Sequence, residues 1–353
     1  MTKGPADLAR AVVRATEAYE EEAPKGGLNL MNNANLWGAN PAIAKAIARL
    51  RPDAFWDYPD NASGTLRRAL ARHHEVDPAS IVLGNGSNEM IDALARAFVE
   101  DGETVAHHAP IFSMIPTFAR LAGAKTVAVP LGPRFALDAP ALARAAQGAK
   151  VTFVCRPNNP TGNAFPRPEV ERVVSAAGGL VVVDEAYAEF GPSSFLPEVA
   201  RNPRLVVLRT FSKAYGLAGF RVGYAVAHPD VAREIAKVRG PFKLNTASEL
   251  VAAMALEERA WVENVVEGVR VERARLSRAL ADLKFDVFPS DANFVLVKPP
   301  VDAHGLAAAL RERGVYVRDF AGPLAAYLRV TVAPPAASER LLAALREILG
   351  AGA

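Results

Sequence analysis

Four groups of polar residues with side chains suited to catalysis each follow a short run of Val, Ile and Leu. They are Gly84-Asn-Gly-Ser-Asn-Glu, Asn158-Asn-Pro-Thr-Gly, Asp184-Glu-Ala-Tyr and Thr210-Phe-Ser-Lys-Ala-Tyr. If the apolar runs are parallel strands, their carboxyl ends meet at one edge of a sheet, where α/β proteins bind ligands. We therefore expect the four groups to form one site.

Asp184 and Lys213 carry the most specific chemistry. Lys213 lies among small and apolar residues with Arg221 eight positions on. A lysine near a second cation loses proton affinity, so its amine can form a Schiff base. A carboxylate at the end of an apolar strand is costly unless it meets a cation. The candidate partner of Asp184 is a metal ion or a protonated ring nitrogen, and the histidines show no metal-ligand spacing.

The other two groups are less specific. Small residues before a helix let backbone amides approach an anion, although Ser87 can equally be an ordinary helix N-cap. Asn158-Asn-Pro-Thr-Gly predicts a turn, from which Asn159 can offer its amide to a ligand. The first group lacks the third glycine of a dinucleotide fingerprint, and the chain has no phosphate-binding Gly-x4-Gly-Lys-Ser/Thr loop. A nucleotide-binding or regulatory module is therefore disfavoured.

The elements that would position these residues alternate along the chain. Helical segments separate seven apolar runs, which begin at Ile81, Thr104, Thr126, Val151, Leu180, Leu205 and Val222. Most runs are apolar at every position, as in strands covered on both faces. The pattern predicts an α/β fold with a mostly parallel seven-stranded sheet covered by helices.

The pattern changes after about Pro241. A long, charged helical stretch (249–283) precedes two alternating strands (293–298 and 327–332), which predicts a smaller α+β domain. We expect an N-terminal arm (1–30) that packs on the small domain or a partner subunit. A large domain (31–243) and a small C-terminal domain (244–353) would follow.

The composition excludes several classes of protein. The 353 residues include 41 basic and 38 acidic side chains and no basic stripe, so we expect no nucleic-acid partner. No apolar run approaches the roughly 18 residues of a membrane span. The single cysteine excludes an internal disulfide and fits a reducing compartment. These features predict a soluble, cytoplasmic protein with two domains.

Over residues 28–349 the chain resembles the fold-type-I pyridoxal-phosphate (PLP) enzymes and, among them, the histidinol-phosphate aminotransferases. The four groups carry the resemblance together with Tyr58-Pro-Asp, Gly216-Leu-Ala-Gly-Phe-Arg-Val-Gly-Tyr and Leu328-Arg-Val-Thr-Val. The motif around Lys213 is the most specific of these. The resemblance implies a large PLP-binding domain and a smaller C-terminal domain, with no metal.

The resemblance also implies roles for individual residues towards pyridoxal 5′-phosphate. Lys213 would bind the cofactor covalently and then shuttle the substrate proton, while Asp184 would pair with the ring nitrogen. Tyr187 and Asn159 would hydrogen-bond the 3′ oxygen of the ring, and Phe112 would stack on the ring. The cofactor's phosphate would lie among Gly86, Ser87, Asn88, Thr210, Ser212 and Arg221.

Three residues would bind substrate, and one would complete the site of another subunit. Leu328 and Val330 share one strand face, so Arg329 points the opposite way, and the resemblance makes it the α-carboxylate anchor. Arg318 would bind the distal phosphate or carboxylate, and Asn35 resembles the second asparagine of the family's Asn-Glu-Asn-Pro sequence. Tyr58 resembles the tyrosine that reaches the phosphate of the other subunit, which implies a homodimer.

Two departures from the family pattern leave the substrate open. Asn33-Ala-Asn-Leu replaces Asn-Glu-Asn-Pro, and Pro110-Ile-Phe-Ser-Met-Ile lacks both hydroxyl groups of Pro-Thr-Tyr-x-x-Tyr. The leading hypothesis is a ping-pong aminotransferase acting on histidinol phosphate and 2-oxoglutarate. A more apolar pocket would suit an aromatic or other hydrophobic amino acid, and a threonine-phosphate decarboxylase shares the lysine and the phosphate cup.

Overall fold

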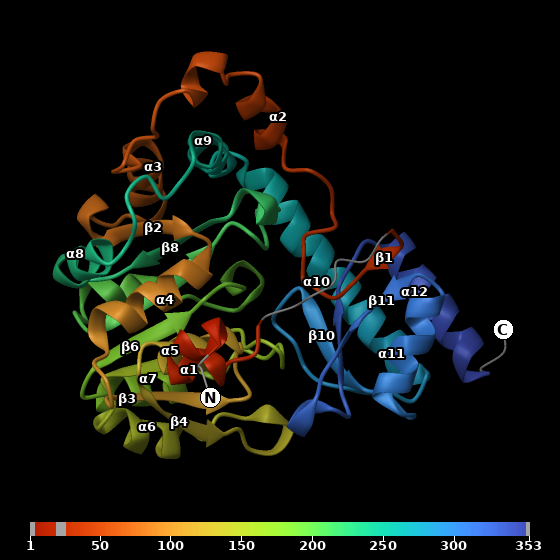
Figure 1. Ribbon diagram of the computed structural model, residues 1–353. Coiled ribbons are helices and arrows are strands. Elements are labelled where there is room, and N and C mark those ends of the chain that lie inside the picture. The colour runs from red at the N-terminus through yellow and green to blue at the C-terminus, as the bar shows by residue number, and fades with distance from the viewer. Residues whose placement is uncertain (1–3, 19–25, 351–353) are drawn as a thin grey trace.

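The computed structural model describes residues 4–18 and 26–350 and is built around a seven-stranded sheet (Figure 1). The strand order is β2-β8-β7-β6-β5-β3-β4. In chain order the strands are β2 (Ile81–Asn85), β3 (Thr104–Ala109), β4 (Lys125–Pro130), β5 (Val151–Cys155), β6 (Leu180–Asp184), β7 (Leu205–Thr210) and β8 (Val222–Val226). Only β8 runs antiparallel to its neighbours within this sheet. The predicted α/β fold and its sheet are confirmed.

Helices cover both faces of this sheet, which is why its central strands are buried at every position. In β6, Val181 and Val183 pack into one core, and Leu180 and Val182 into the other. The first core is covered by α3 (Gly64–His74), α6 (Ala139–Gln147), α7 (Arg167–Ala176) and α9 (Thr246–Ala255). The second is covered by α4 (Ser87–Phe98), α5 (Met114–Leu121) and α8 (Pro229–Lys237).

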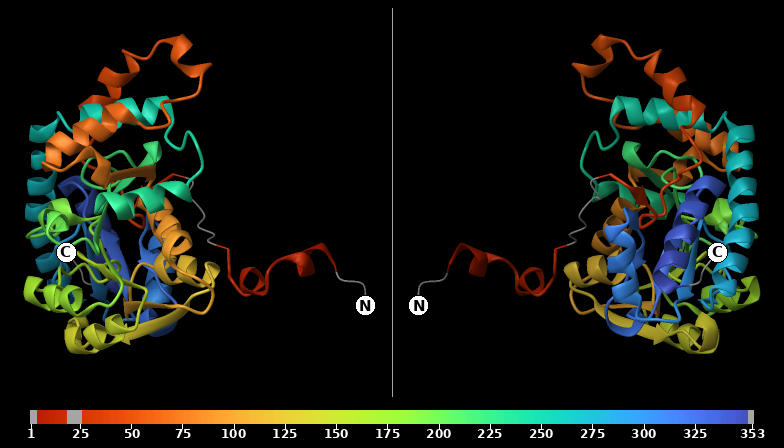
Figure 2. Two further views of the ribbon diagram at one scale, coloured as in Figure 1. Left: turned by 90° about the vertical axis from the view of Figure 1, so that its left-hand side faces the viewer. Right: turned by 90° about the vertical axis from the view of Figure 1, so that its right-hand side faces the viewer.

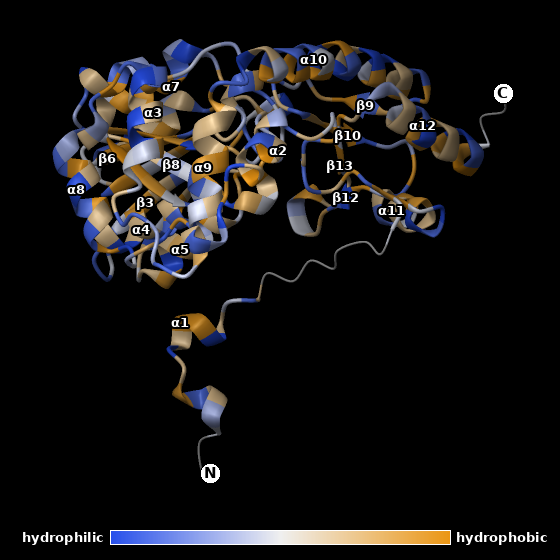
Figure 3. Ribbon diagram, turned by 90° about the horizontal axis from the view of Figure 1, so that it is seen from above, coloured by the Kyte–Doolittle hydropathy of each residue, from blue (hydrophilic) through white to orange (hydrophobic). Residues whose placement is uncertain are grey.

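A second, four-stranded antiparallel sheet has the order β12-β13-β10-β9. Its strands are β9 (Asp286–Val287), β10 (Phe294–Lys298), β12 (Arg318–Asp319) and β13 (Leu328–Thr331). The helices beside it are α10 (Arg259–Asp282), α11 (Ala303–Glu312) and α12 (Pro335–Leu349), and Figure 3 shows α10 running from the large body to this smaller one.

The predicted helical stretch 249–283 is wrong in its continuity, because it divides into α9 and α10. The α9 helix packs on α3 and on α2 (Pro41–Ile47) beside the large sheet, whereas α10 packs on α12 and β9. One straight helix cannot follow both directions, and the chain turns between Ala255 and Arg259. The expected boundary near residue 243 lies just before α9, and the domain limits stay a prediction.

The two described segments of the N-terminal part of the chain lie in different places. Residues 5–14 form η1 (Pro5–Leu8) and α1 (Ala11–Arg14), which project from the body with α1 near α5 (Figure 2). β1 (Leu28–Asn29) instead pairs in parallel with β11 (Val315–Tyr316) of the smaller body. Residues 1–3 and 19–25 of the predicted arm lie outside the described residues. In the described ranges, no helix has the length and apolar character needed to cross a membrane.

The sheet topology brings the four polar groups to one edge. Because β8 alone is reversed, the carboxyl ends of β2, β5, β6 and β7 lie at the same edge as the amino end of β8. The last residues of β2, β5, β6 and β7 are Asn85, Cys155, Asp184 and Thr210, and Arg221 directly precedes β8.

A buried ion cluster lies at this edge, next to Asp184. Arg209 pairs with Glu185 at 3.1 Å and with Glu189 at 2.7 Å, and all three side chains are largely buried. Burial alone would lower the pKa of Arg209, but Glu189 and Glu185 raise it above its ordinary value. Burial raises the pKa of Glu189 despite the Arg209 charge. The charge of Arg209 therefore reduces the cost of burying Glu185 and Glu189 inside the protein.

Replacing Arg209 with Met should destabilise the fold by about 3–5 kcal/mol, because it leaves two buried carboxyl groups without their cation. Burial already raises the pKa of Glu189, and the Arg209 charge that opposes this rise would be lost, so the deficit should be smallest near about pH 4 and grow as the pH rises. Urea unfolding at several pH values measures both effects. Arg204→Ala, at an exposed arginine bonded to Gly178, is the matched control, and an equal loss in both variants would contradict the prediction.

Candidate active site

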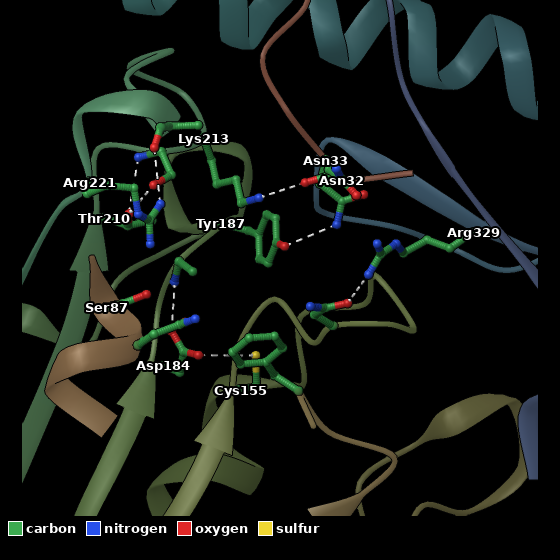
Figure 4. A pocket seen from close by; sticks show the side chains of 16 residues that line it. Asn32, Asn33, Ser87, Cys155, Asp184, Tyr187, Thr210, Lys213, Arg221 and Arg329 are labelled. Atoms are coloured by element: carbon green, nitrogen blue, oxygen red, sulfur yellow. Dashed lines mark hydrogen bonds between the residues drawn. The ribbon is translucent and has the colours of Figure 1, made fainter. Parts of the chain in front are cut away.

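One cavity of about 300 Å³ opens at the carboxyl edge of the large sheet and reaches the smaller body. Figure 4 shows its side chains converging from both sheets and from the segment after β1. The lining residues are Asn32, Asn33, Ser87, Asn88, Phe112, Cys155, Asn159, Asp184, Ala186, Tyr187, Thr210, Ser212, Lys213, Ala218, Arg221 and Arg329.

Lys213 enters this cavity from the loop that follows β7. Phe211 and Ala214 are fully buried on either side of it and anchor the loop in the core. The Ser212 backbone N–H donates to Thr210 Oγ1 at 3.1 Å, which tightens the turn. Lys213 Nζ donates to the Asn32 carbonyl at 3.0 Å and lies 5.5 Å from the centre of the Tyr187 ring. The amine is thus held inside the cavity.

Asp184 ends β6 at the floor of the cavity and is 3% exposed. Burial raises its pKa to about 6, although a hydrogen bond from the Ala186 N–H opposes the shift. Cys155 Sγ lies 3.9 Å from Asp184 Oδ2, and burial raises the pKa of this thiol, so it stays protonated. A cationic group in the cavity would stabilise the ionised form of Asp184.

The start of α4 and the Arg221 side chain form a cup that suits an anion. Gly86 adopts φ +81°, and a Cβ there would lie 2.5 Å from Arg221 Nη2. A Cβ on Gly223 would lie 2.2 Å from the backbone nitrogen of Ser87, so close approach requires glycine at position 223, whereas the positive φ favours glycine at position 86. Free N–H groups at a helix start, hydroxyl groups and a guanidinium are the donors that bind phosphate.

Tyr187 stands between the lysine and the smaller body. Burial raises the pKa of its phenol to about 12, while Arg329 and a hydrogen bond from Asn33 oppose the shift. Asn33 Nδ2 donates to the phenol oxygen at 3.1 Å. The phenol therefore stays protonated at neutral pH and can donate its proton.

Arg329 and Arg318 approach the site from the smaller body. Arg329 donates to Asn159 Oδ1 and to the Met31 carbonyl, so residues from two other segments fix its guanidinium. A second cavity of about 220 Å³ shares Arg329, Asn159 and Phe112 with the first and adds Arg318. Its remaining lining is largely apolar and consists of Pro110, Ile111, Ser113, Pro160, Phe320 and Leu324.

Most of the predicted site residues lie together, and four lie outside the first cavity. Gly86 is adjacent to its lining, and Arg318 lines the second cavity. Asn35 instead donates to the Ala214 carbonyl and accepts from the Trp37 N–H. Tyr58 is 75% exposed and stacks on Phe242, with ring centres 4.5 Å apart.

Five lining residues were not among the predicted site residues: Asn32, Asn33, Cys155, Ala186 and Ala218. Cys155 could have been found, because it ends an apolar run whose neighbouring strand ends in Asp184. The position of Asn33 depends on contacts with Thr331 and Asn293, far away in the sequence. No local pattern distinguishes Asn33 from Asn35.

The arrangement fits pyridoxal phosphate. An amine, a buried carboxyl group with a raised pKa and an anion cup open into the same cavity. The cofactor has a matching group for each, namely an aldehyde, a basic ring nitrogen and a phosphate. The glycine positions 86 and 223 keep the cup open.

Comparisons with known proteins agree with this geometry. Residues 25–345 match the family model described as aminotransferase class I and II. Histidinol-phosphate aminotransferase from Caldanaerobacter subterraneus is 39% identical over 83% of this chain and 84% of its own. The enzyme of that name from Roseiflexus castenholzii is 38% identical over 91% of this chain and 89% of its own.

A solved structure is also similar. The histidinol-phosphate aminotransferase from Sinorhizobium meliloti, in complex with pyridoxal-5′-phosphate, superposes with a TM-score of 0.89. It is 28% identical in sequence, and the match covers 98% of both chains. The resemblance predicted from the sequence motifs is confirmed.

Gly86→Ala should weaken the binding of pyridoxal phosphate about tenfold or more, because a Cβ at positive φ would displace Arg221. Titration of the cofactor-free protein, followed by tryptophan fluorescence, measures the dissociation constant. Gly219→Ala is the control, since a Cβ there meets nothing within 4 Å. Equal affinity in the two variants would show that the close approach at Gly86 is unimportant.

Proposed function

The chain belongs to the class I and II aminotransferases, and from this premise we propose that it transfers the amino group of histidinol phosphate to 2-oxoglutarate. The products would be imidazole acetol phosphate and glutamate, formed in a ping-pong cycle. The cofactor is pyridoxal 5′-phosphate. The convergence of Lys213, Asp184 and the anion cup on one cavity carries this proposal.

Each wall of the cavity holds a different part of the cofactor in this proposal. Asp184 pairs with the ring nitrogen, Phe112 covers a ring face, and Tyr187 and Asn159 bond the 3′ oxygen. The phosphate is bound by the residues of the cup: Gly86, Ser87, Asn88, Thr210, Ser212 and Arg221. Arg221 contributes a planar, permanently charged fork, which suits bidentate contact with a phosphate.

The reaction then depends on what these side chains do with charge and protons. When bound, pyridoxal phosphate supplies a carbonyl carbon for the amine and a ring that accepts the electron pair released at the substrate Cα. Lys213 Nζ would take the proton from the substrate Cα and return it to the former carbonyl carbon of the cofactor. Asp184 keeps a negative charge opposite the ring nitrogen, and Tyr187 donates its phenol proton.

Two arginines from the smaller body favour anionic substrates. Arg329 lies on both cavities, and Arg318 lines the second. A phosphate on the amino donor and the two carboxylates of the acceptor can therefore use the same pair of guanidinium groups. Asn35 lies on the segment that follows Met31, and we propose that it also binds the substrate.

The second cavity also favours another donor. Ile111, Phe112, Phe320 and Leu324 give it an apolar surface that suits an aromatic amino acid. A single contact changes specificity by about 1–3 kcal/mol, so Arg318 and the apolar residues favour different donors. An aromatic or other hydrophobic amino-acid aminotransferase is therefore the second candidate function.

Half-reactions with single donors test the substrate. The enzyme with bound cofactor is mixed in a stopped-flow instrument with histidinol phosphate, phenylalanine, glutamate or threonine phosphate. We expect histidinol phosphate to convert the chromophore fastest, with no release of CO2 from any donor. Rapid conversion by phenylalanine alone would favour the second candidate, and CO2 release from threonine phosphate would favour a decarboxylase.

A homodimer is the proposed assembly. Tyr58 lies beside the exposed side chains of Phe55, Trp56 and Phe242, and an exposed apolar patch of this kind indicates an interface. We propose that a second copy covers it and that Tyr58 reaches the partner's phosphate cup. A cytoplasmic location, which suits the buried, unpaired Cys155, is part of the same proposal.

Mixing two inactive variants tests the shared site. Lys213→Ala and Tyr58→Phe proteins should each have low activity. An equal mixture should regain up to a quarter of the wild-type activity, because half of its dimers are mixed and one of the two sites in each mixed dimer is intact. Activity is measured after the subunits have exchanged, and size-exclusion chromatography checks the dimer. Mixing Lys213→Ala with Asp184→Ala is the control, since both changes affect the same chain's cavity. Equal recovery in both mixtures would contradict a shared site.

A further inference from the structure

We propose that Asn33 is a positioning residue that orients the hydroxyl group of Tyr187 and ties it to the strand carrying Arg329. The inference rests on the proposed function, since it assigns Asn33 to the cofactor contact made by Tyr187. Asn33 is 1% exposed and Tyr187 4% exposed, and both line the cavity (Figure 4).

The backbone of Asn33 is the first part of this device. Its φ of +53° lies in the left-handed region, which asparagine and glycine adopt more readily than other residues. Its N–H donates to Thr331 Oγ1 at 3.0 Å, and its carbonyl accepts from Asn293 Nδ2 at 3.0 Å. The turn also aims the carbonyl of the preceding Asn32 at Lys213 Nζ.

The side chain of Asn33 is the second part. Thr331 Oγ1 lies 3.3 Å from Asn33 Oδ1 and also donates to the Leu30 carbonyl at 2.8 Å. The amide oxygen therefore faces the smaller body, and the amide nitrogen faces Tyr187. Because Nδ2 can only donate, the Tyr187 oxygen acts as acceptor in this contact, and its own proton is left to point elsewhere.

The direction of this hydrogen bond matters for the cofactor. A phenol that donates to the 3′ oxygen stabilises negative charge there, which lowers the pKa of the chromophore conjugated with it. An acceptor at position 33 would compete for the same phenol proton. An amide donor at this position instead leaves that proton available to the cofactor.

The same contacts link the two bodies of the molecule. Thr331 lies on β13, two residues after Arg329, and the segment that contains Asn33 is bonded to both. Tyr187 follows β6 in the large sheet. Asn33 is thus a direct bridge between the tyrosine that would bond the cofactor and the strand that would bond the substrate.

Three substitutions separate the parts of this device. Asn33→Gly keeps the left-handed backbone and removes the side chain, Asn33→Ala also strains the backbone, and Asn33→Asp replaces the donor with an acceptor. Asn29→Ala is the matched control, because Asn29 lies on the same segment and, among the described contacts, its side chain only accepts a local hydrogen bond from the Met31 N–H. Each protein is loaded with pyridoxal phosphate, and its visible absorption is titrated with pH.

We expect Asn33→Gly to raise the chromophore pKa by about half a unit to one unit, the range for one hydrogen bond. Asn33→Asp should raise it further, and Asn29→Ala should leave it unchanged. Asn33→Ala should in addition weaken cofactor binding, because the strained turn moves the Asn32 carbonyl. A purely structural asparagine would lower the unfolding temperature without moving the chromophore pKa.

Thr331→Val and Thr331→Ser keep the test decisive if the Asn33 variants fold poorly. Removing the hydroxyl group should raise the chromophore pKa, and Ser should restore it. Tyr187→Phe distinguishes the two levels of failure. If it raises the pKa while Asn33→Gly and Thr331→Val do not, the role of Asn33 is wrong and the proposed function stands. If the wild-type protein forms no chromophore, the cofactor assignment fails and the role of Asn33 fails with it. If the chromophore forms but Tyr187→Phe leaves its pKa unchanged, the contact of Tyr187 with the 3′ oxygen is wrong, and the role of Asn33 fails while the proposed function stands.

Discussion

The burial of a carboxyl group at the end of an apolar strand is the constraint on which this site depends. Asp184 ends β6, where both faces of the sheet are covered, and burial raises its pKa to about 6. The next residue, Glu185, is also fully buried but pairs with Arg209. Glu185 is thus neutralised by Arg209 inside the protein, whereas Asp184 faces the cavity. A cationic ligand is the natural partner for Asp184.

The reversed strand β8 makes the opposite wall of the site possible. Because β8 runs against β2 and β7, Arg221 arrives at the same edge as the carboxyl ends of the other strands. Its guanidinium then lies against Gly86, so that a Cβ there would displace the arginine side chain. Lys213 lies three residues after β7, between the buried side chains of Phe211 and Ala214, which fix the loop that carries the amine. Chain direction in the sheet therefore sets the spacing of the three groups.

The sequence predicted the parts of the molecule whose cause is local. The seven apolar runs became the seven strands of the sheet, and most of them are buried on both faces. The polar groups that follow four of these strands meet at one edge because of the strand directions. The position of Asn33 could not be predicted, because its partner Thr331 is 298 residues away. The break between α9 and α10 could not be predicted for a similar reason, because α9 packs on the large body and α10 packs on the smaller one. Local sequence patterns thus predicted the polar groups at the strand ends but not the contacts between the two bodies.

In the proposed function, substrate recognition is divided between the fixed guanidinium of Arg329 and the mostly apolar surface of the second cavity. Arg329 is bonded to Asn159 of the large body and to Met31 of the N-terminal segment, so its fork is oriented before an anion arrives, which reduces the ordering cost of binding. An anchor of this kind serves any substrate with a carboxylate or phosphate and cannot by itself choose among donors. The choice must then depend on the second cavity, where Arg318 lies beside Ile111 and Phe320. A donor with both a ring and a phosphate uses the apolar surface and the cation together, whereas a donor with only one of them leaves part of the cavity unsatisfied.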